Sequence, residues 1–404
     1  MPEDISIGDT LRDLRAQRAL TQEGLAEAAG LHVNTLRKIE QGGTGSMETY
    51  HRLARSLGVT TGRLIAGQPA RRQDHGDDNK VSLLAMRRAI SPPVGLDGRA
   101  ALPEEEPDLT ALRAAAEGFA RSYHSDRYRD MAVLVPELVT SAHAAVAHYT
   151  HTPQEAEARR VRSEILQLAG RYLTQVRAYD LAHMALTDAV RDAAAAGDRL
   201  NAAASIIGQA WVLLRQGRLD EAEELSTDTA DQVEPRISKA TGEELAAWGW
   251  LLLRASAAAA RNNRPEEARE AITLARTAGT ALGTEVTHRL RGWVSFGPTT
   301  VELKAIENEV IADRPDRVLT LSEPLTPGKS TSDNWNRHML DVAKAHARMR
   351  HDHEATDVLA GLMRTSPQWL SHQRLAEETF AEVRGRRKRS LTSDQRKLAA
   401  LFAR

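Results

Sequence analysis

Residues 21–42, TQEGLAEAAGLHVNTLRKIEQG, hold side chains that suit the reading of DNA bases. Two short helical stretches flank Gly30, and the second, from about His32 to Gln41, would present four side chains outward: Val33, Asn34, Arg37 and Lys38. Asn pairs with adenine through two hydrogen bonds, Arg pairs with guanine, and an apolar group suits the thymine methyl. Because a helix in the major groove reads bases with its N-terminal residues, the segment predicts a DNA-recognition helix.

The neighbouring residues predict a helical frame that positions this segment. A first helix carries an apolar face made of Ile7, Leu11 and Leu14. Thr21 stands where an N-cap is needed, and Gly30 stands where the chain must turn left-handed between the two helices of the hairpin. A fourth helix is expected from Ser46, and a fifth closes the unit near residue 66.

The spacing T21-Q22-x-x-L25-A26-x-x-x-G30-x-x-x-x-T35-L36-x-x-I39-E40-x-G42 resembles the lambda-repressor-like (XRE/Cro) helix-turn-helix family. The resemblance implies a five-helix DNA-binding domain over residues 1–66. It also implies DNA contacts at six positions: Gln22, Val33, Asn34, Thr35, Arg37 and Lys38. Gln22 matches the family's phosphate-contacting glutamine, and Val33 and Asn34 match its base-reading residues. Thr35 lies beside these two, and Arg37 and Lys38 lie one turn further on. Glu40 would hold the turn after the recognition helix.

The charge of this unit predicts that it acts in pairs. Residues 1–66 contain eight Lys or Arg and eight Asp or Glu, so the unit is neutral. Neutralisation of phosphates supplies much of the affinity for DNA, and a neutral unit binds weakly alone. We therefore expect a homodimer whose two recognition helices enter successive major grooves about 34 Å apart. The alternative, a hairpin that serves packing only, leaves the outward Asn34, Arg37 and Lys38 unexplained.

Length and composition favour a helical protein of more than one unit. A chain of 404 residues exceeds the usual limit for one compact core, and only 4 % of its residues are aromatic. Cysteine is absent, which excludes disulfides and thiolate metal sites and suits a reducing cytoplasm. The N-terminus is unlike a signal peptide, and no run of about 18 apolar residues predicts a membrane span.

The chain divides into four expected segments. The DNA-binding unit covers 1–66, a polar linker with one short helix covers 67–106, helical repeats cover 107–383, and a basic tail with a terminal helix covers 384–404. The tail holds eight Lys or Arg against one Asp, and Ser393 is expected to cap its helix. This tail could contact DNA phosphate or an acidic partner, or it could be a solvated end.

The third segment shows a pattern of helix, polar turn and helix that recurs at steps of 38 to 51 residues. Its clearest instances are QGRLDEAEEL (216–225) and NNRPEEAREAI (262–272). Alignment places six residues at one buried position of each second helix: Met131, Ala182, Ala222, Ala268, Val318 and Thr356. The pattern resembles degenerate tetratricopeptide repeats, which implies an all-α solenoid with a concave binding face. The whole chain resembles actinobacterial XRE regulators with such repeats and, more distantly, the RRNPP peptide-responsive superfamily.

Polar and aromatic residues on the first helices of these pairs are candidates for an effector site: Asn201, Gln209, Arg289, Trp293, Asn334 and Asn336. Asn amides pair with peptide backbone, and Trp offers apolar area. The alternative is that the tryptophans belong to the core and the amides are solvated.

No motif for catalysis or for a cofactor is found. The sequence lacks a P-loop, a dinucleotide glycine fingerprint and a G-x-S-x-G elbow. Two groups of histidines, 143–151 and 346–353, lack the carboxylates and spacing of a zinc site. We therefore expect no enzyme, cofactor or metal, but a DNA-binding transcriptional regulator that responds to a peptide or small-molecule effector. The alternative is an interaction protein in which DNA binding serves only to tether.

Overall fold

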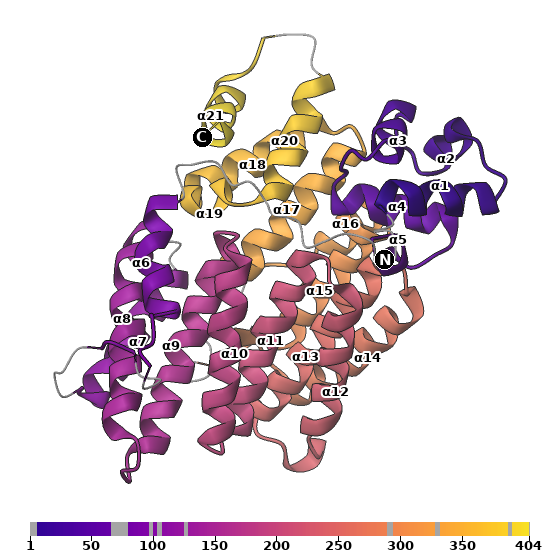
Figure 1. The fold of residues 1–404 in the computed structure, drawn as a ribbon. Coiled ribbons are helices and arrows are strands. Elements are labelled where there is room, and N and C mark those ends of the chain that lie inside the picture. The colour runs from indigo at the N-terminus through magenta and orange to yellow at the C-terminus, as the bar shows by residue number, and fades with distance from the viewer. Residues whose placement is uncertain are drawn as a thin grey trace.

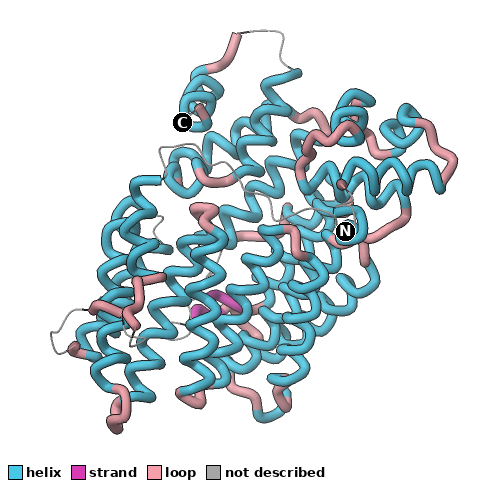
Figure 2. Tube along the Cα trace, in the orientation of Figure 1, coloured by secondary structure: helices cyan, strands magenta, loops and turns pink. Residues whose placement is uncertain are grey.

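The computed structural model describes residues 6–65, 80–96, 100–102, 107–124, 128–288, 294–327, 332–386 and 390–403. In this part of the chain the fold is all-α apart from one short hairpin of strands, as the sequence predicts (Figures 1 and 2). The N-terminal helices form a head domain, here residues 6–65. The remaining helices form a solenoid of antiparallel pairs.

The head domain has the five helices expected from the sequence: α1 (Ile7–Gln17), α2 (Gln22–Ala28), α3 (Val33–Glu40), α4 (Met47–Leu57) and α5 (Thr61–Ile65). The Thr21 side chain caps α2 by accepting a hydrogen bond from the Gly24 N–H at 3.0 Å. Gly30 has a φ of 59°, the left-handed conformation that this tight turn requires. The predicted apolar faces meet in one core, where Leu11, Leu25 and Leu36 are fully buried.

Six antiparallel pairs of helices make up the solenoid in the described part of the chain. They are α7 (Leu109–His124) with α8 (Tyr128–Tyr149), α9 (Glu155–Gln175) with α10 (Tyr179–Ala195), α11 (Arg199–Gln216) with α12 (Leu219–Val233), α13 (Gly242–Arg261) with α14 (Pro265–Leu282), α15 (Pro298–Ile311) with α16 (Pro315–Ser322), and α17 (Ser332–Arg348) with α18 (Asp352–Thr365). All six residues aligned from the sequence are buried near the start of a second helix. A small or slim side chain there lets each second helix pack closely on the first.

The turns inside five of these pairs share one backbone conformation. The residue two places before the second helix has a left-handed φ, between 58° and 79°, in each case: Arg177, Gly217, Asn263, Asp313 and Arg350. This regularity at the backbone level shows that the pairs are structural repeats even where their side chains differ.

Two segments outside the pairs complete the solenoid. Helix α6 (Lys80–Ile90), the short helix expected in the linker, packs on α8, and its Met86 and Ile90 are buried in the largest apolar core. At the other end are α19 (Pro367–Ser371), α20 (Arg374–Arg386) and α21 (Ser393–Phe402). The cap of α21 is Thr392 rather than Ser393, because Thr392 and Gln395 form a reciprocal capping box.

The strands β1 (Val286–His288) and β2 (Val294–Phe296) pair antiparallel between α14 and α15 and appear in magenta in Figure 2. Phe296 from β2 is fully buried among residues of α13, where Gly249 leaves room for its ring. This hairpin was not expected from the sequence, which shows too short an alternating stretch to distinguish it from a loop.

Helix α8 includes one stretch, Asp130–Tyr149, that is long and apolar enough to cross a membrane by length and composition. The sequence had predicted no such stretch. In the structure this helix packs against α6, α7 and α9, and its Met131, Val139 and Ala142 are fully buried in the solenoid core. Packing within the protein thus buries 44% of this apolar stretch.

Candidate nucleic-acid interface and the adjoining cleft

The N-terminal half of α3 and the side chains one turn further on form the candidate DNA-reading surface. Asn34, Arg37 and Lys38 are exposed, Thr35 is half-buried, and Val33 is half-buried against the core of the head domain. The side chain of His32 caps the helix by accepting a hydrogen bond from the Asn34 N–H at 3.2 Å. The cap satisfies one of the amide donors at the helix N-terminus and fixes the start of the surface.

A polar network behind α3 sets the angle between α2 and α3. Glu40 is only 4 % exposed and accepts hydrogen bonds from Arg15 Nε at 2.6 Å and from Gln22 Nε2 at 2.7 Å. Burial opposes ionisation of Glu40, but the bonds from Arg15 and Gln22 outweigh it and lower the pKa of the carboxyl group. Glu40 thus links the first three helices, a wider role than the local turn inferred from sequence.

Two of the candidate DNA contacts are held inside the head domain in this structure. Arg37 donates to Glu23 at 2.8 Å and to Gln22 Oε1 at 3.3 Å, while the Gln22 amide donates to Glu40. The Arg37–Glu23 ion pair is exposed on both sides, so it costs little to open. DNA phosphate or a base edge could therefore replace Glu23 as the partner of Arg37.

Comparison with known proteins assigns this part of the chain. Residues 6–66 match the model of a family described as a helix-turn-helix domain. The N-terminal unit is a helix-turn-helix domain. Such domains bind DNA, so the match supports a DNA-binding regulator. No curated protein was found to be similar to the chain.

The helix-turn-helix domain is docked on the solenoid through α4 and α5 (Figure 1). The backbone carbonyl of Arg261 accepts hydrogen bonds from Thr61 Oγ1 at 2.7 Å and from His51 Nδ1 at 2.8 Å. His51 is buried, and this burial lowers the pKa of its imidazole, which favours the neutral form in the docked arrangement. The contact is therefore specific and largely uncharged at its centre.

The docking surface on the solenoid consists of turns from three successive helix pairs. Met47 lies against Gly217 in the first turn. The amide of Asn263 in the second turn donates to the Val59 carbonyl at 3.2 Å. Arg55 donates to the Ala312 carbonyl in the third turn at 2.8 Å. The left-handed turns that define the repeat thus also form the seat of the DNA-binding domain.

Helix α17 adds a charged contact to this seat. Glu48 of the helix-turn-helix domain pairs with Lys344, at 3.4 Å, and with Arg348. Two cations of α17 thus hold an acidic side chain at the start of α4.

A cleft of 1880 Å³ lies between the helix-turn-helix domain and the first helices of several solenoid pairs. Its walls include Met47, Glu48 and His51 from α4 and residues of α11, α13, α15 and α17. Drug-sized ligands occupy pockets of roughly 300–1,000 Å³, so this space could hold a larger molecule or a short peptide. The cleft is thus lined by both parts of the protein.

The effector candidates inferred from sequence fall in different places. Asn334 lines the cleft, whereas Gln209 donates to Thr187 at 2.8 Å and the buried Asn336 donates to Ser366 at 2.9 Å, both outside its lining. Arg289 and Trp293 lie outside the described residues. Of the candidates within the described residues, only Asn334 therefore lies on a helix face that lines the cleft.

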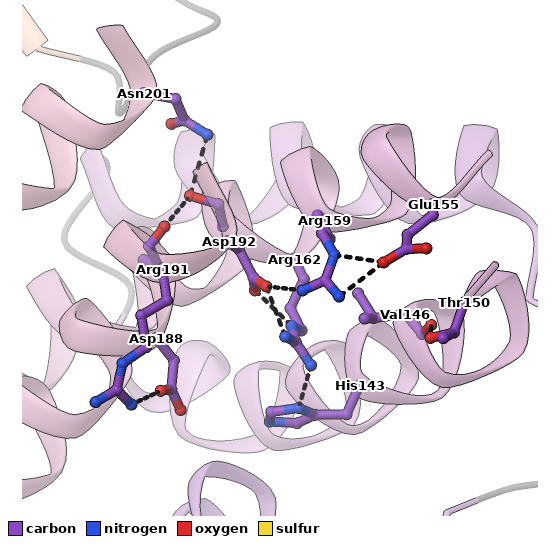
Figure 3. Close-up of polar contacts among 12 residues, drawn as sticks. His143, Val146, Thr150, Glu155, Arg159, Arg162, Asp188, Arg191, Asp192 and Asn201 are labelled. Atoms are coloured by element: carbon purple, nitrogen blue, oxygen red, sulfur yellow. Dashed lines mark hydrogen bonds and ion pairs between the residues drawn. The ribbon is translucent and has the colours of Figure 1, made fainter. Parts of the chain in front are cut away.

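Asn201 does not meet a ligand groove as the sequence had suggested. It is 1 % exposed, donates to Ser163 Oγ at 3.0 Å and accepts a hydrogen bond from Gln167, so its amide joins α11 to α9. Figure 3 shows it beside a structural ion-pair network centred on Asp192, which Arg162 holds at 2.5 Å and 2.6 Å and Arg159 at 3.2 Å. The amide on this helix face serves packing.

The two groups of histidines noted in the sequence make contacts within the protein. His143 contacts Arg162 at 3.2 Å, and burial together with that cation lowers its pKa to about 4. His346 and His351 face each other at 3.4 Å between their Nδ1 atoms. Within the described ranges, no group of three or more His, Asp or Glu side chains is arranged to hold a metal ion.

Proposed function

We propose that the chain is a sequence-specific, DNA-binding transcriptional regulator of the cytoplasm, and that it acts without catalysis or a cofactor. The observation that supports this most directly is the helix-turn-helix domain itself, whose α3 exposes Asn34, Arg37 and Lys38. Asn34 and Arg37 would read base edges, and Gln22 and Lys38 would contact phosphates. Val33 would read bases beside Asn34, and Thr35 would border them.

The protein is proposed to act as a homodimer. A single helix-turn-helix domain of zero net charge gains little from phosphate neutralisation, whereas two domains add their contacts. Two α3 helices about one DNA turn apart would then require a palindromic site. Sedimentation equilibrium of the full chain tests this point, and a monomer at the concentration that shifts DNA would contradict it.

The solenoid, read as degenerate tetratricopeptide repeats, is proposed to bind an effector in the cleft. The cleft has the helix-turn-helix domain as one wall, so a ligand that fits only one position of that domain would shift its docking equilibrium. This arrangement favours an effector-responsive regulator over an adaptor whose DNA binding serves only to tether. Either sign of control, repression or activation, is compatible with it.

Mobility shift on the DNA upstream of the protein's own coding region tests DNA reading. Asn34→Ala combined with Arg37→Ala should abolish the specific shift, because each lost bidentate contact costs about 1–3 kcal/mol of discrimination. Both side chains are exposed, so thermal unfolding should stay close to that of the parent. Arg191→Ala is the matched control, since this exposed arginine lies on α10 and pairs only with Asp188 among the described residues. A double variant that shifts DNA as well as the parent does would refute the assignment of α3.

A further inference from the structure

Two similar pentapeptides, which differ at one residue, occur on neighbouring first helices of the solenoid. Residues 211–215 of α11 read WVLLR and residues 250–254 of α13 read WLLLR. Spacing of four residues places each Trp and its Arg on one face of the helix. All four of these side chains line the cleft: Trp211, Arg215, Trp250 and Arg254.

The two arginines stack on the two indoles. The Arg254 guanidinium carbon lies 5.1 Å from the centre of the Trp250 ring and 5.4 Å from that of Trp211. The Arg215 guanidinium carbon lies 5.7 Å from the Trp211 ring. Cation–π attraction favours a guanidinium close to an indole face, and a guanidinium can bind a carboxylate or phosphate through two parallel hydrogen bonds.

Among the described residues these two arginines have no acidic partner, unlike three other cations that line the same cleft. Lys304 and Arg261 share Glu307, and Arg337 lies 3.5 Å from Asp341. By contrast, within the described ranges neither Arg215 nor Arg254 forms an ion pair or a hydrogen bond, and Arg254 Nε is buried without a partner. Native proteins rarely leave such donors unsatisfied, so each unsatisfied donor needs an explanation.

The electrostatics of the cleft point to a missing negative charge. Burial, followed by the neighbouring Arg337, lowers the pKa of Arg215 to about 10, and burial lowers the pKa of Arg254 to about 9. Glu307 is already shared among cations, and burial raises the pKa of Asp341 to about 6. Neither of these two carboxylates forms an ion pair with Arg215 or Arg254 in the described part of the chain.

We propose that Arg215 and Arg254, held by Trp211 and Trp250, form the anchor for an anionic ligand that carries a carboxylate or phosphate group. The rest of the ligand would extend through the cleft toward α4. The role of this site as the effector site rests on the proposed function. Binding of the anion does not, because it is independent of DNA. The effector class is thus an organic oxyanion, which none of the Asn residues suggested by sequence would select.

Titration calorimetry of the full chain without DNA tests the site, with inorganic pyrophosphate and citrate as separate probes and sodium chloride at equal ionic strength as the blank. The parent should bind at least one probe, and the stronger probe shows whether phosphate or carboxylate is preferred. Arg215→Gln and Arg254→Gln should each weaken binding about tenfold or more, since hydrogen bonds to charged groups contribute roughly 1.5–3 kcal/mol. Arg191→Gln, on exposed α10, should leave it unchanged.

The site is overturned if neither probe binds the parent. It is also overturned if both glutamine variants bind the probe as tightly as the parent does (an adventitious ion only). Thermal unfolding supplies a second measurement. In ligand-free protein Arg254→Gln should unfold at the same temperature as the parent or higher, because it removes an unpaired charge whose Nε is buried. A large drop instead would show that the guanidinium is structural and would also count against the site. If the probe binds but leaves the mobility shift unaltered, the anion site stands and its role as effector site is refuted. The mobility-shift result for the Asn34 and Arg37 double variant tests DNA reading alone.

Discussion

The side chain of Asn262 joins two parts of the chain that lie 200 residues apart. Its Oδ1 accepts a hydrogen bond from the Gly62 N–H at 2.8 Å, and its Nδ2 donates to Asp220 at 2.6 Å. Asn262 is 0 % exposed, so this amide is a buried link between α5 of the helix-turn-helix domain and two turns of the solenoid. This junction forms part of the wall of the cleft. We expect the strength of the link to determine how firmly the DNA-binding domain is held.

Asn262→Ala should loosen the docking of the helix-turn-helix domain without unfolding it. The variant leaves the Gly62 N–H and the Asp220 carboxylate without their buried partner, a loss of about 1–3 kcal/mol. Hydrogen exchange of the α5 amides should therefore become roughly tenfold faster or more. Asn308→Ala is the control, because Asn308 donates to Ser256 inside the solenoid at 2.7 Å. Equal protection of α5 in both variants would show that Asn262 does not hold the domain.

Glu23→Gln should strengthen DNA binding. The change frees Arg37 from its exposed ion pair and removes a negative charge beside the proposed phosphate contacts. We expect affinity to rise about two- to fivefold, the range set by a surface ion pair of up to about 1 kcal/mol. The measurement is the dissociation constant on one operator fragment at fixed salt.

Glu27→Gln separates the two causes in this experiment. Glu27 is also exposed on α2 and has no bond to Arg37 among the described contacts. It should give the smaller gain that comes from charge alone. If both variants bind DNA alike, the tie between Glu23 and Arg37 has no bearing on affinity.

Local signals in the sequence were sufficient for the helix-turn-helix domain and the repeat. Thr21, Gly30 and the buried faces of five helices follow from capping, backbone freedom and periodicity, which act within a few residues. The buried position shared by Ala182, Ala222 and the other aligned residues also depends on local spacing. These features are determined by neighbours along the chain, so one sequence reveals them.

Features that depend on distant contacts could not be obtained this way. Nothing local distinguishes Asn201, which joins two helices inside the solenoid, from Asn334, which lines the cleft. The seat of the helix-turn-helix domain on three turns also depends on how the repeats stack. One overlooked signal was the pair of Trp-x-x-x-Arg pentapeptides at 211–215 and 250–254, whose similarity was readable in the sequence.

Gly249→Ala should destabilise the solenoid near the β-hairpin. A methyl group at this position of α13 would overlap the buried ring of Phe296. Overpacking of this kind costs about 1–3 kcal/mol, seen as a lower midpoint in denaturant unfolding. Gly385→Ala is the matched change, since this helical glycine in α20 has nothing within 4 Å of the added methyl group. A midpoint for Gly249→Ala as high as that for Gly385→Ala would show that β2 moves away without cost.

The stability of the helix-turn-helix domain should fall in acid because of Glu40. Burial disfavours the charged carboxylate, but the hydrogen bonds from Arg15 and Gln22 prevail and place its folded pKa below the unfolded value of about 4.3. The carboxylate therefore contributes stability in full above about pH 4.3, and this contribution is lost as the pH falls through the folded pKa. Glu40→Gln should lower stability at pH 7 by roughly 1–3 kcal/mol and flatten the acid limb of thermal unfolding followed between pH 3 and 7. Glu27→Gln, on the exposed face of α2, should retain the parent's acid limb. An unchanged acid limb in Glu40→Gln would place the titrating group elsewhere in the domain.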